Sequence, residues 1–403
     1  MCYTIFICNF FYRYIKMKKK IAIFGSTGSI GKTLLKIIDN DIKNFKITLL
    51  TANQNHNKLL KQAKKYKVKN LIIKNFKSYL SLKKKVKNLD IKVYNDFNSL
   101  DKIFKKKADY IMSAITGIDG LEPTINSIKY TRKIAIANKE AIICGWNLIF
   151  KELKKNKTQF VPVDSEHFSI WYGIKNNKDE IESIFLTASG GPFLNLPINK
   201  FKKINLKDAL KHPNWKMGKK ITIDSATMMN KLFEIIEARN IFNIGFDKIS
   251  IITHPDSYIH SIIKFRNGVV KIIAHETDMK IPIFNSIYRQ IKKIKFKTED
   301  IDFKKLNNLQ LENVNKKKFP LINVLKDIPS DCSLFETLLV SANDQIVNLF
   351  LNKKLVFTDI SKMLMKFINK KEFKKYKLIK PKKIQDILKL NEYVHLKINS
   401  KSI

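Results

Sequence analysis

The apolar residues in the first third of this 403-residue chain form short, evenly spaced runs. Lysine-rich stretches with helical spacing separate one run from the next, as happens when buried strands alternate with helices. The predicted strands are residues 21–25 (IAIFG), 45–52 (FKITLLTA), 70–74 (NLIIK), 109–114 (DYIMSA) and 133–137 (KIAIA). Because such alternation produces a parallel sheet with crossover connections, residues 17–163 are predicted to form an α/β domain.

The pattern changes after this domain. Residues 164–288 contain longer apolar runs, such as 249–253 (ISIIT), and some of these strands can pair antiparallel, so we expect a central α+β domain. Residues 289–318 are polar and rich in lysine, which predicts a linker. Residues 319–403 return to helical spacing and predict a C-terminal helical bundle.

The predicted bundle opens with Ser333 and Glu336, whose spacing is that of a capping box. The helix that follows carries an apolar stripe along one face. The stripe consists of Phe335, Leu338, Leu339, Ala342, Ile346, Val347 and Phe350. Two further helices are predicted at residues 359–369 and 384–396.

The first sixteen residues (MCYTIFICNFFYRYIK) differ from the rest of the chain. They lack the charged leader and the small-residue cleavage site of a secretory signal, and one arginine without serine does not fit an organellar transit peptide. Met17 is followed at once by KKKIAIFG, a natural start. Residues 1–16 are therefore expected to be an extension without an assigned role.

The composition, 44% hydrophobic and 28% charged, is that of a chain able to bury a core. No stretch approaches the roughly 20 uninterrupted apolar residues of a spanning helix, so no membrane partner is expected. The four cysteines (2, 8, 144 and 332) contain no Cys-x-x-Cys pair, which argues against a disulfide framework and a cysteine zinc site. A reducing, cytoplasmic location is expected.

The formal net charge is +42, but only five of the 77 basic residues are arginines. The lysines are spread along the whole chain, whereas nucleic-acid-binding proteins usually concentrate positive charge on one face. This composition is typical of drift toward AT-rich codons. We therefore expect no nucleic-acid partner, although the charge would attract anionic small molecules such as sugar phosphates.

A glycine-rich turn lies between the first predicted strand and the first predicted helix. Gly25, Gly28 and Gly31 are three of only twelve glycines in the chain. Glycine lets the backbone approach a pyrophosphate, whose charge a helix N-terminus favours, so a dinucleotide site is predicted; a tight turn without ligand is the alternative. Residues 53–55 lack the acid that commonly binds the ribose of NAD, and Lys58 is close, which favours NADP.

Acidic residues follow another predicted strand. Asp164 and Glu166 lie two positions apart, and such residues of an extended segment point the same way. Their charges repel unless a cation or a proton lies between them. An all-oxygen set suits Mg²⁺ or Mn²⁺, and Glu234 can complete a three-carboxylate site; a solvated loop is the alternative.

Ser225, Asn230 and Lys231 supply a hydroxyl, an amide and an ammonium group, which suit a phosphate monoester. Lys231 and Glu234 also lie on one helix face, so a surface ion pair is the alternative for them. Residues 212–218 (HPNWKMG) place a tryptophan and a methionine in a polar loop. They predict either core packing or a lid that closes over substrate.

Six motifs occur in order: GSTGSIG at 25–31, ANKE at 137–140, PVDSEH at 162–167, SGGPF at 189–193, HPNWKMG at 212–218 and DSATMMNK at 224–231. Together they closely resemble the 1-deoxy-D-xylulose 5-phosphate reductoisomerase family of the non-mevalonate isoprenoid pathway. The resemblance implies an oxidoreductase that uses NADPH and Mg²⁺ or Mn²⁺ to rearrange and reduce that sugar phosphate to 2-C-methyl-D-erythritol 4-phosphate. It also implies a homodimer, a Rossmann-like NADPH domain, a central domain for catalysis and dimer contacts, and a C-terminal helical bundle.

The resemblance assigns roles to single residues. Those implied to bind NADPH are Gly25, Thr27, Gly28, Ser29, Ile30, Asn53, Gln54, Asn55, Asn138, Glu140 and Gly218. The implied metal ligands are Asp164, Glu166 and Glu234. The implied substrate contacts are Lys139, Ser165, Glu166, Ser189, His212, Trp215, Ser225, Asn230, Lys231 and Glu234. The implied catalytic residues are Lys139, Asp164, Glu166, His212 and Glu234; Trp215 and Met217 match a lid, and His260 and Met279 match residues around the site.

The chain departs from the family pattern in places. Ala188 stands where relatives usually have glycine, and it would restrict its loop if that position needs a positive φ. Residues 53–55 stand where many relatives carry Gly-Lys-Asn beside the 2′-phosphate, with Lys58 as a substitute for the lysine. Residues 343–345 (Asn-Asp-Gln) replace a usual Asn-Glu pairing.

Two other functions are left open by the residues. One is an NADP-dependent dehydrogenase that acts on another phosphorylated substrate. Semialdehyde dehydrogenases of this layout need a nucleophilic cysteine, for which Cys144 is the internal candidate. The other is a lysine-rich binding protein on a decayed enzyme scaffold, which would bind DNA with steep salt dependence and without catalysis.

Overall fold

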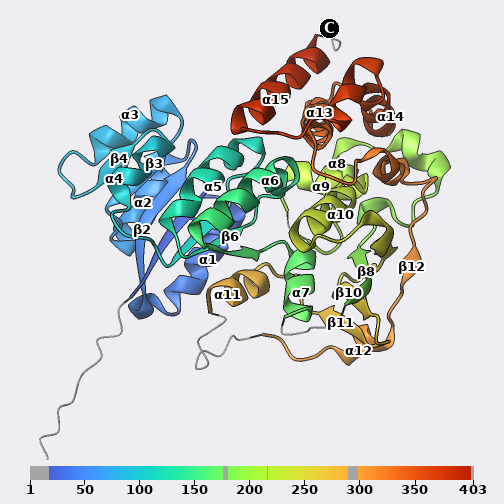
Figure 1. Cartoon of the computed structure of the whole chain (residues 1–403), viewed down its shortest axis with the longest axis horizontal. Helices are drawn as coiled ribbons and strands as arrows, with labels where there is room; N and C mark the ends of the chain where they lie inside the picture. The colour runs from blue at the N-terminus through green and yellow to red at the C-terminus, as the bar shows by residue number, and fades with distance from the viewer. Residues whose placement is uncertain (1–17, 176–179, 216, 289–297, 401–403) are drawn as a thin grey trace, which may run out of the picture.

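The computed structural model describes residues 18–175, 180–215, 217–288 and 298–400. The predicted extension 1–16 and the first part of the predicted linker, residues 289–297, lie outside them. The described chain forms two sheets and a C-terminal helical bundle (Figure 1). No helix among these residues is both long and apolar enough to cross a membrane.

A seven-stranded sheet forms the N-terminal part. Its strands, in spatial order, are β4 (Lys92–Tyr94), β3 (Asn70–Ile73), β2 (Phe45–Ala52), β1 (Lys19–Phe24), β5 (Tyr110–Ser113), β6 (Lys133–Ile136) and β7 (Gln159–Pro162). All neighbouring strands are parallel, so the predicted α/β fold is confirmed. The strand order reverses between β1 and β5, and ligands of such sheets bind at the carboxyl ends of the strands at this point.

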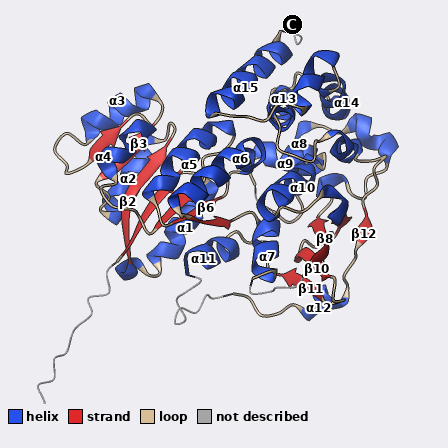
Figure 2. Cartoon of the chain, in the orientation of Figure 1, coloured by secondary structure: helices blue, strands red, loops and turns tan. Residues whose placement is uncertain are grey.

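Helices cover both faces of this sheet (Figure 2). They are α1 (Ser29–Asp39), α2 (His56–Tyr66), α3 (Phe76–Lys85), α4 (Leu100–Ile103), α5 (Leu121–Ser127) and α6 (Lys139–Asn156). In β1, Ile21 and Ile23 pack into a core with α1 and α2, while Ala22 and Phe24 pack into a second core with α5 and α6. Burial on both faces explains why these strands are continuous apolar runs in the sequence.

The central part contains a mixed five-stranded sheet. Its order is β11 (Val270–Ala274), β10 (Ile259–Phe265), β8 (Ile181–Ala188), β9 (Ile249–Thr253) and β12 (Glu312–Asn313). The β8–β9 pair is parallel and the others are antiparallel, which confirms the predicted α+β class. Helices α7 (Ser165–Gly173) and α10 (Met229–Phe242) cover one face around a core that contains Ile184 and Ile263.

Shorter elements connect these parts. They are α8 (Leu206–Ala209), α9 (Lys219–Ala226), α11 (Lys280–Tyr288) and α12 (Phe303–Asn307). Helix α11 packs against α1, and thus ties the central part to the N-terminal sheet. Both α12 and β12 come from the stretch predicted as a linker, where β12 pairs with β9.

The C-terminal bundle consists of α13 (Leu334–Leu351), α14 (Phe357–Ile368) and α15 (Ile384–Asn399). Ser333 and Glu336 form the predicted capping box, and every residue of the predicted apolar stripe of α13 is buried. Helix α13 also packs against α6 and α9, two helices of the other parts (Figure 1). The bundle therefore rests on elements that line the cavity described next.

Candidate active site

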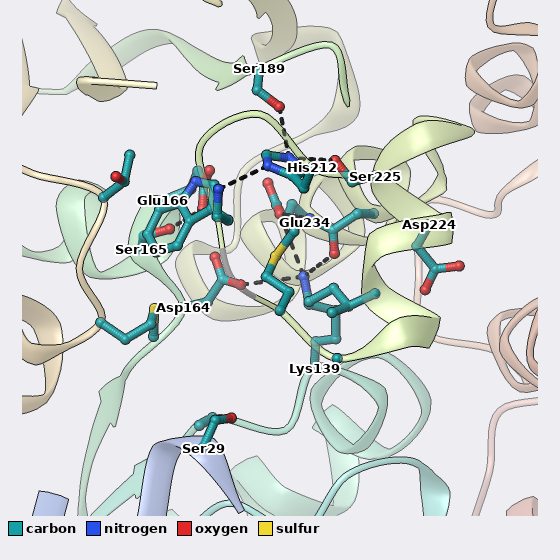
Figure 3. A pocket seen from close by; sticks show the side chains of 18 of the residues that line it. Ser29, Lys139, Asp164, Ser165, Glu166, Ser189, His212, Asp224, Ser225 and Glu234 are labelled. Atoms are coloured by element: carbon teal, nitrogen blue, oxygen red, sulfur yellow. Dashed lines mark hydrogen bonds and ion pairs between the residues drawn. The ribbon is translucent and has the colours of Figure 1, made fainter. Parts of the chain in front are cut away.

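A cavity of about 810 Å³ lies at the carboxyl edge of the parallel sheet. The turn after β1, the start of α6 and residues of α7, α9 and α10 form its wall, together with the loop that carries Trp215 (Figure 3). The cavity is thus placed where the strand order of the sheet reverses, as expected for a ligand site of this fold.

The glycine turn has the conformation that a dinucleotide site needs. Gly25 has a φ of +76°, and a Cβ there would lie 2.5 Å from a backbone carbonyl oxygen. A Cβ on Gly31 would lie 2.5 Å from the Cα of Ser26 in the turn, so only glycine lets α1 begin this close to β1. Gly28 is the N-cap of α1, and Ser29 and Ile30 in the first turn line the cavity. The backbone N–H groups of Ser29 and Ile30, at the N-terminus of the helix, can bind an anion such as a pyrophosphate.

Some predicted cofactor residues lie outside the cavity wall, namely Gly25, Thr27, Asn53, Gln54 and Asn55. Asn55 has a structural role, because its side-chain oxygen accepts a hydrogen bond of 3.0 Å from the Lys58 N–H and caps α2. The Lys58 ammonium lies against that of Lys32 in α1. Slight burial and then Lys32 lower the pKa of Lys58. Two ammonium groups this close attract an anion to the end of β2.

The ANKE motif begins α6 at the cavity wall. The Asn138 side chain accepts a hydrogen bond of 2.8 Å from the Ala141 N–H and donates one of 2.8 Å to the Gly117 carbonyl. Asn138 thereby caps α6 and ties it to the loop after β5. This fixes the first turn, from which Lys139 and Glu140 reach the cavity.

Asp164, Glu166 and Glu234 converge in the cavity between Ser29 of the glycine turn and Ser189 (Figure 3). In the part of the cavity that runs from these carboxylates to Ser189, they form the carboxylate end. One carboxylate oxygen from each lies within 4.8 Å of the others. The predicted reason for this was wrong: Asp164 is the N-cap of α7 and Glu166 lies in its first turn, so a helix start, and not an extended segment, directs both side chains. Such a compact, all-oxygen set fits Mg²⁺ or Mn²⁺.

Two buried lysines balance part of this charge. Lys139 Nζ lies 3.3 Å from Asp164 Oδ2 and 3.4 Å from Glu234 Oε1. Lys231 Nζ lies 2.9 Å from Glu166 Oε1 and 2.5 Å from Glu234 Oε2. Burial alone lowers the pKa of each lysine, but the carboxylates outweigh it and raise both pKa values above the ordinary range. Burial and then Glu234 raise the pKa of Glu166. A cation bound among the carboxylates would oppose this rise, because it favours the ionised form of Glu166.

Behind these carboxylates lie His167 and Glu237, which the sequence did not assign. His167 Nδ1 lies 3.1 Å from Asp164 Oδ1, and His167 Nε2 donates a hydrogen bond of 2.8 Å to the Glu234 carbonyl. Burial alone lowers the pKa of His167, but Glu237 and Asp164 raise it to about 9. Burial raises the pKa of Glu237 to about 8. The available signal was that Glu237 follows Glu234 by one helical turn.

Ser189, His212 and Ser225 form a hydroxyl cradle at the other end of the cavity. His212 Nε2 lies 3.1 Å from each of the two serine hydroxyls (Figure 3). His212 Nδ1 accepts a hydrogen bond of 2.9 Å from the backbone N–H of Trp215, so the ring proton of the neutral imidazole is on Nε2. Burial and then Lys231 lower the pKa of His212 to about 4, so the ring is neutral at pH 7. Such neutral donors beside a lysine suit a phosphate group.

Asn230 and Lys231 make their contacts at the carboxylate end. Asn230 Oδ1 accepts a hydrogen bond of 2.6 Å from Lys139, and its amide nitrogen donates to Glu234. Ser165 also lies there, as its hydroxyl donates to Glu166 at 2.6 Å. The Lys231 and Glu234 side chains are only 7% and 1% exposed, which excludes the alternative of a surface ion pair.

Trp215 and Met217 line the cavity, which argues against the core-packing alternative. The Trp215 ring meets the His260 ring edge-on, with 6.1 Å between centroids. His260 stacks on His275 at 3.8 Å, and Met279 is a further part of the wall. The tryptophan loop is therefore supported on one side by a column of rings.

Two other expectations change. Ala188 ends β8, pairs with Thr253 and does not have a positive φ, so it imposes no restriction on the loop. The positive φ values of this loop occur at Gly190 and Gly191.

Cys144 is 2% exposed, and burial raises the pKa of its thiol well above the ordinary value. A nucleophilic role for Cys144 is therefore unsupported.

The fold and the cavity together define a class of protein. A parallel sheet with a glycine turn at its switch point is the architecture of dinucleotide-dependent oxidoreductases. The acid-rich cluster and the neutral cradle add places for a divalent cation and for a phosphate group. The chain is thus an α/β oxidoreductase whose site suits a small phosphorylated substrate.

Comparison with known proteins identifies the family. The family model for 1-deoxy-D-xylulose 5-phosphate reductoisomerase matches residues 21–145, and two models of C-terminal domains of that enzyme match residues 160–242 and 275–395. The reductoisomerase of Pelagibacter ubique (strain HTCC1062) is 59% identical over 388 residues, which are 96% of this chain and 100% of that protein. The one of Wigglesworthia glossinidia brevipalpis is 39% identical over 93% of this chain and 96% of that protein.

Solved structures agree. The reductoisomerase from Zymomonas mobilis in complex with NADPH has a TM-score of 0.84 at 29% identity, over 96% of this chain and 99% of that chain. A reductoisomerase in complex with NADPH, fosmidomycin and magnesium has a TM-score of 0.86 at 29% identity, over 95% of this chain and 98% of that chain. The chain belongs to the 1-deoxy-D-xylulose 5-phosphate reductoisomerase family, and the predicted family is confirmed.

Proposed function

We propose that the protein converts 1-deoxy-D-xylulose 5-phosphate to 2-C-methyl-D-erythritol 4-phosphate with NADPH and a divalent metal ion, in isoprenoid precursor synthesis. The observation that carries this proposal is one cavity with three convergent carboxylates at one end and a neutral hydroxyl cradle at the other. The family supports it, and so does the relative that binds NADPH, fosmidomycin and magnesium.

NADPH would lie along the carboxyl edge of the parallel sheet. The turn residues 27–30 would hold its pyrophosphate at the N-terminus of α1. Lys32 and Lys58 would bind the 2′-phosphate, in place of the lysine that many relatives carry near residue 54. Asn138 and Glu140 would lie toward the nicotinamide half, with Gly218 opposite in the cavity wall.

Asp164, Glu166 and Glu234 would hold Mg²⁺ or Mn²⁺. When bound, the cation supplies Lewis-acid polarisation of substrate oxygens and NADPH supplies a hydride. His167 positions this ligand set, because it holds Asp164 through the side chain and Glu234 through the backbone. Lys139 stays protonated among the carboxylates and can donate a hydrogen bond to a substrate oxygen.

The phosphate of the substrate would lie in the hydroxyl cradle. Ser189 and Ser225 offer hydroxyl groups, and His212 offers its Nε2–H. Ser165 and Asn230, at the carboxylate end, would bind hydroxyl groups of the substrate. A phosphate held far from the reacting carbons supplies binding energy that orients them.

Trp215 and Met217 would cover the bound substrate and exclude water from the reacting carbons. Trp215 docks edge-on against His260. Burial and then His275 lower the pKa of His260 well below its ordinary value, so this docking surface is uncharged.

We also propose a homodimer that forms through the open face of the five-stranded sheet. Helices α7 and α10 cover the other face. On the open face, Phe185, Ile262 and Ile272 lie in register across β8, β10 and β11, and Ile272 is 50% exposed. A row of apolar side chains on a sheet face is typical of subunit interfaces. Sedimentation of a variant with Ile272→Glu and Ile262→Lys should show monomers if this face carries the contact.

The remaining assignments are proposals of the same kind. Residues 17–163 would form the NADPH domain, 164–288 the catalytic and dimer domain, 289–318 a linker and 319–403 the bundle. The two described cysteines, Cys144 and Cys332, are not joined in a disulfide, in keeping with a reducing, cytoplasmic location.

The test is NADPH oxidation, followed by absorbance, with 1-deoxy-D-xylulose 5-phosphate and with or without Mg²⁺ or Mn²⁺. The proposal predicts metal-dependent oxidation and 2-C-methyl-D-erythritol 4-phosphate as the product, identified by mass spectrometry. Oxidation with a different phosphorylated substrate in preference, or none with this substrate at any metal concentration, would contradict it.

A further inference from the structure

Lys220 is the centre of a second charged cluster, on the wall of the cavity away from the three convergent carboxylates. Its Nζ lies 3.2 Å from Glu140 Oε1, 2.9 Å from Asp224 Oδ2 and 2.7 Å from Asp344 Oδ1. The three acids come from α6, α9 and α13, which belong to three different parts of the chain. Asn343, also on α13, donates a hydrogen bond of 2.8 Å to the other oxygen of Asp224.

The cluster joins segments that carry the proposed site. Glu140 follows Lys139 at the start of α6, and Asp224 precedes Ser225 of the cradle. Lys220 lies in the first turn of α9, directly after the tryptophan loop. Asp344 is the one acid of the cluster that comes from the C-terminal bundle, and no residue of the bundle is part of the cavity wall among the described residues.

The charges of the cluster depend on each other. The side chains of Glu140, Asp224 and Asp344 are 12%, 2% and 24% exposed, and a buried carboxylate is costly without a cation. Burial alone raises the pKa of Glu140, but Lys220 outweighs it and holds the pKa below its ordinary value. Burial raises the pKa of Asp344 to about 6. Lys220 therefore keeps Glu140 ionised at the cavity wall.

We propose that Lys220 is a positioning residue, which holds the Glu140 carboxylate toward the cofactor and links its placement, through Asp344, to the docking of the C-terminal bundle. This deepens the proposed function, since it takes the ligand on that side of the cavity to be NADPH. The bundle then acts on cofactor binding without touching the cofactor. Glu140 is the group through which Lys220 acts.

A double-mutant cycle tests this, with the dissociation constant of NADPH measured by its fluorescence in the absence of substrate. Lys220→Met should weaken NADPH binding on the order of tenfold or more, the usual scale for a residue that orients a binding group. In a Glu140→Gln background the same substitution should have little further effect, because its target is gone. Lys220→Arg should restore most of the affinity.

Asp344→Asn provides a second test that does not leave the ammonium group unpaired, since Glu140 and Asp224 remain. It should weaken NADPH binding in the same direction by a smaller factor. The matched control is Glu372→Gln, which breaks an exposed ion pair with Lys397 in the same bundle and should leave NADPH binding unchanged.

Equal NADPH affinity in wild type, Lys220→Met and Asp344→Asn would overturn this inference and leave the proposed function intact. An equal loss from Lys220→Met with and without Glu140→Gln would also overturn it, because a general structural role would produce that result. If the wild-type protein binds no NADPH, both this inference and the proposed function are wrong.

Discussion

The two ends of the cavity differ in the charge of the groups that form them. At the carboxylate end, Asp164, Glu166 and Glu234 face two lysines, and every charge is buried or nearly so. At the cradle end, His212 and the two serine hydroxyls around it are neutral at pH 7. The first end is built from opposed charges before any ligand arrives, whereas the second offers neutral donors beside the Lys231 ammonium group.

This difference indicates which ligand each end accepts. The three convergent carboxylates of the first end are the oxygen ligands that Mg²⁺ or Mn²⁺ takes, so this end favours a cation. Neutral donors beside Lys231 cost little to keep without a ligand and gain a charge partner when a phosphate binds. Substitutions at one end should therefore change metal dependence, and those at the other should change phosphate affinity.

The largest expected effect follows from Glu234→Gln. It removes the acid that both lysines contact, so turnover should fall by about 10³-fold, as when a preorganised electrostatic group is lost. NADPH oxidation at saturating substrate and a range of Mn²⁺ concentrations measures this. Glu182→Gln, in an exposed ion pair with Lys264, is the matched control and should remain fully active. Metal-dependent turnover at the wild-type rate in Glu234→Gln would remove the distinction between the two ends.

Lys231→Met should destabilise the metal-free protein by about 3–5 kcal/mol, because it leaves the buried Glu166 carboxylate without its ammonium partner and removes one of the two ammonium groups that contact Glu234. Mg²⁺ or Mn²⁺ should recover much of this loss, and should raise the melting temperature of the variant more than that of the wild type. Thermal unfolding with and without metal measures both. A metal effect no larger in the variant than in the wild type would show that lysine and cation do not compensate the same carboxylates.

Ser225→Ala should act at the cradle end alone. Loss of one hydroxyl donor should raise the KM for the sugar phosphate about fivefold to tenfold, the value of one hydrogen bond, without changing the metal concentration needed for activity. Steady-state kinetics at varied substrate and varied Mn²⁺ separates the two. If the metal dependence shifts as well, the two ends are not independent.

The smallest effect concerns pH. The pKa of His212 is about 4 in the folded protein against an ordinary value of 6.5, so the folded state binds fewer protons between these values. The stability that this neutral ring contributes is present above pH 6.5 and is lost as the pH falls toward 4. His212→Asn should make unfolding less pH-dependent in this range.

Burial and Lys231 lower the pKa of His212, and bound phosphate should raise it. A phosphate dianion favours the imidazolium, so the pKa of His212 should rise when inorganic phosphate or substrate is added. NMR titration of the imidazole measures the pKa directly. No rise on addition of either ligand would place the phosphate elsewhere.

The sequence predicted the first sheet well because its signal is local. Each strand from β1 to β3, and likewise β5 and β6, is a compact apolar run, and burial on both faces makes such runs continuous. The run 158–163 (TQFVPV) was expected to open the central domain, but as β7 it pairs with β6 in the first sheet. The sequence pattern missed β4, a three-residue strand (KVY) at the sheet edge that is half polar and hardly buried. Edge strands of this length carry no distinct pattern.

The site was predictable where neighbouring residues share a task. Asp164 and Glu166 are close in sequence, and so are Ser225 and Lys231. Their spacing was enough to predict a carboxylate metal site and a phosphate site. The partners that balance them are not close in sequence: Lys139 reaches Glu234 from 95 residues away, and Lys220 reaches Asp344 from another part of the fold. Charge balance in a buried site is a property of tertiary structure, which spacing along the chain does not encode.

The most direct test of the opposition between the two ends is Mn²⁺ binding, measured by electron paramagnetic resonance in the absence of substrate and NADPH. Wild-type protein and Ser225→Ala should bind Mn²⁺ with the same affinity, and Glu234→Gln should bind it about a hundredfold more weakly. Equal Mn²⁺ affinity in Glu234→Gln and wild type would contradict the account, because the carboxylate end would then not be the metal site.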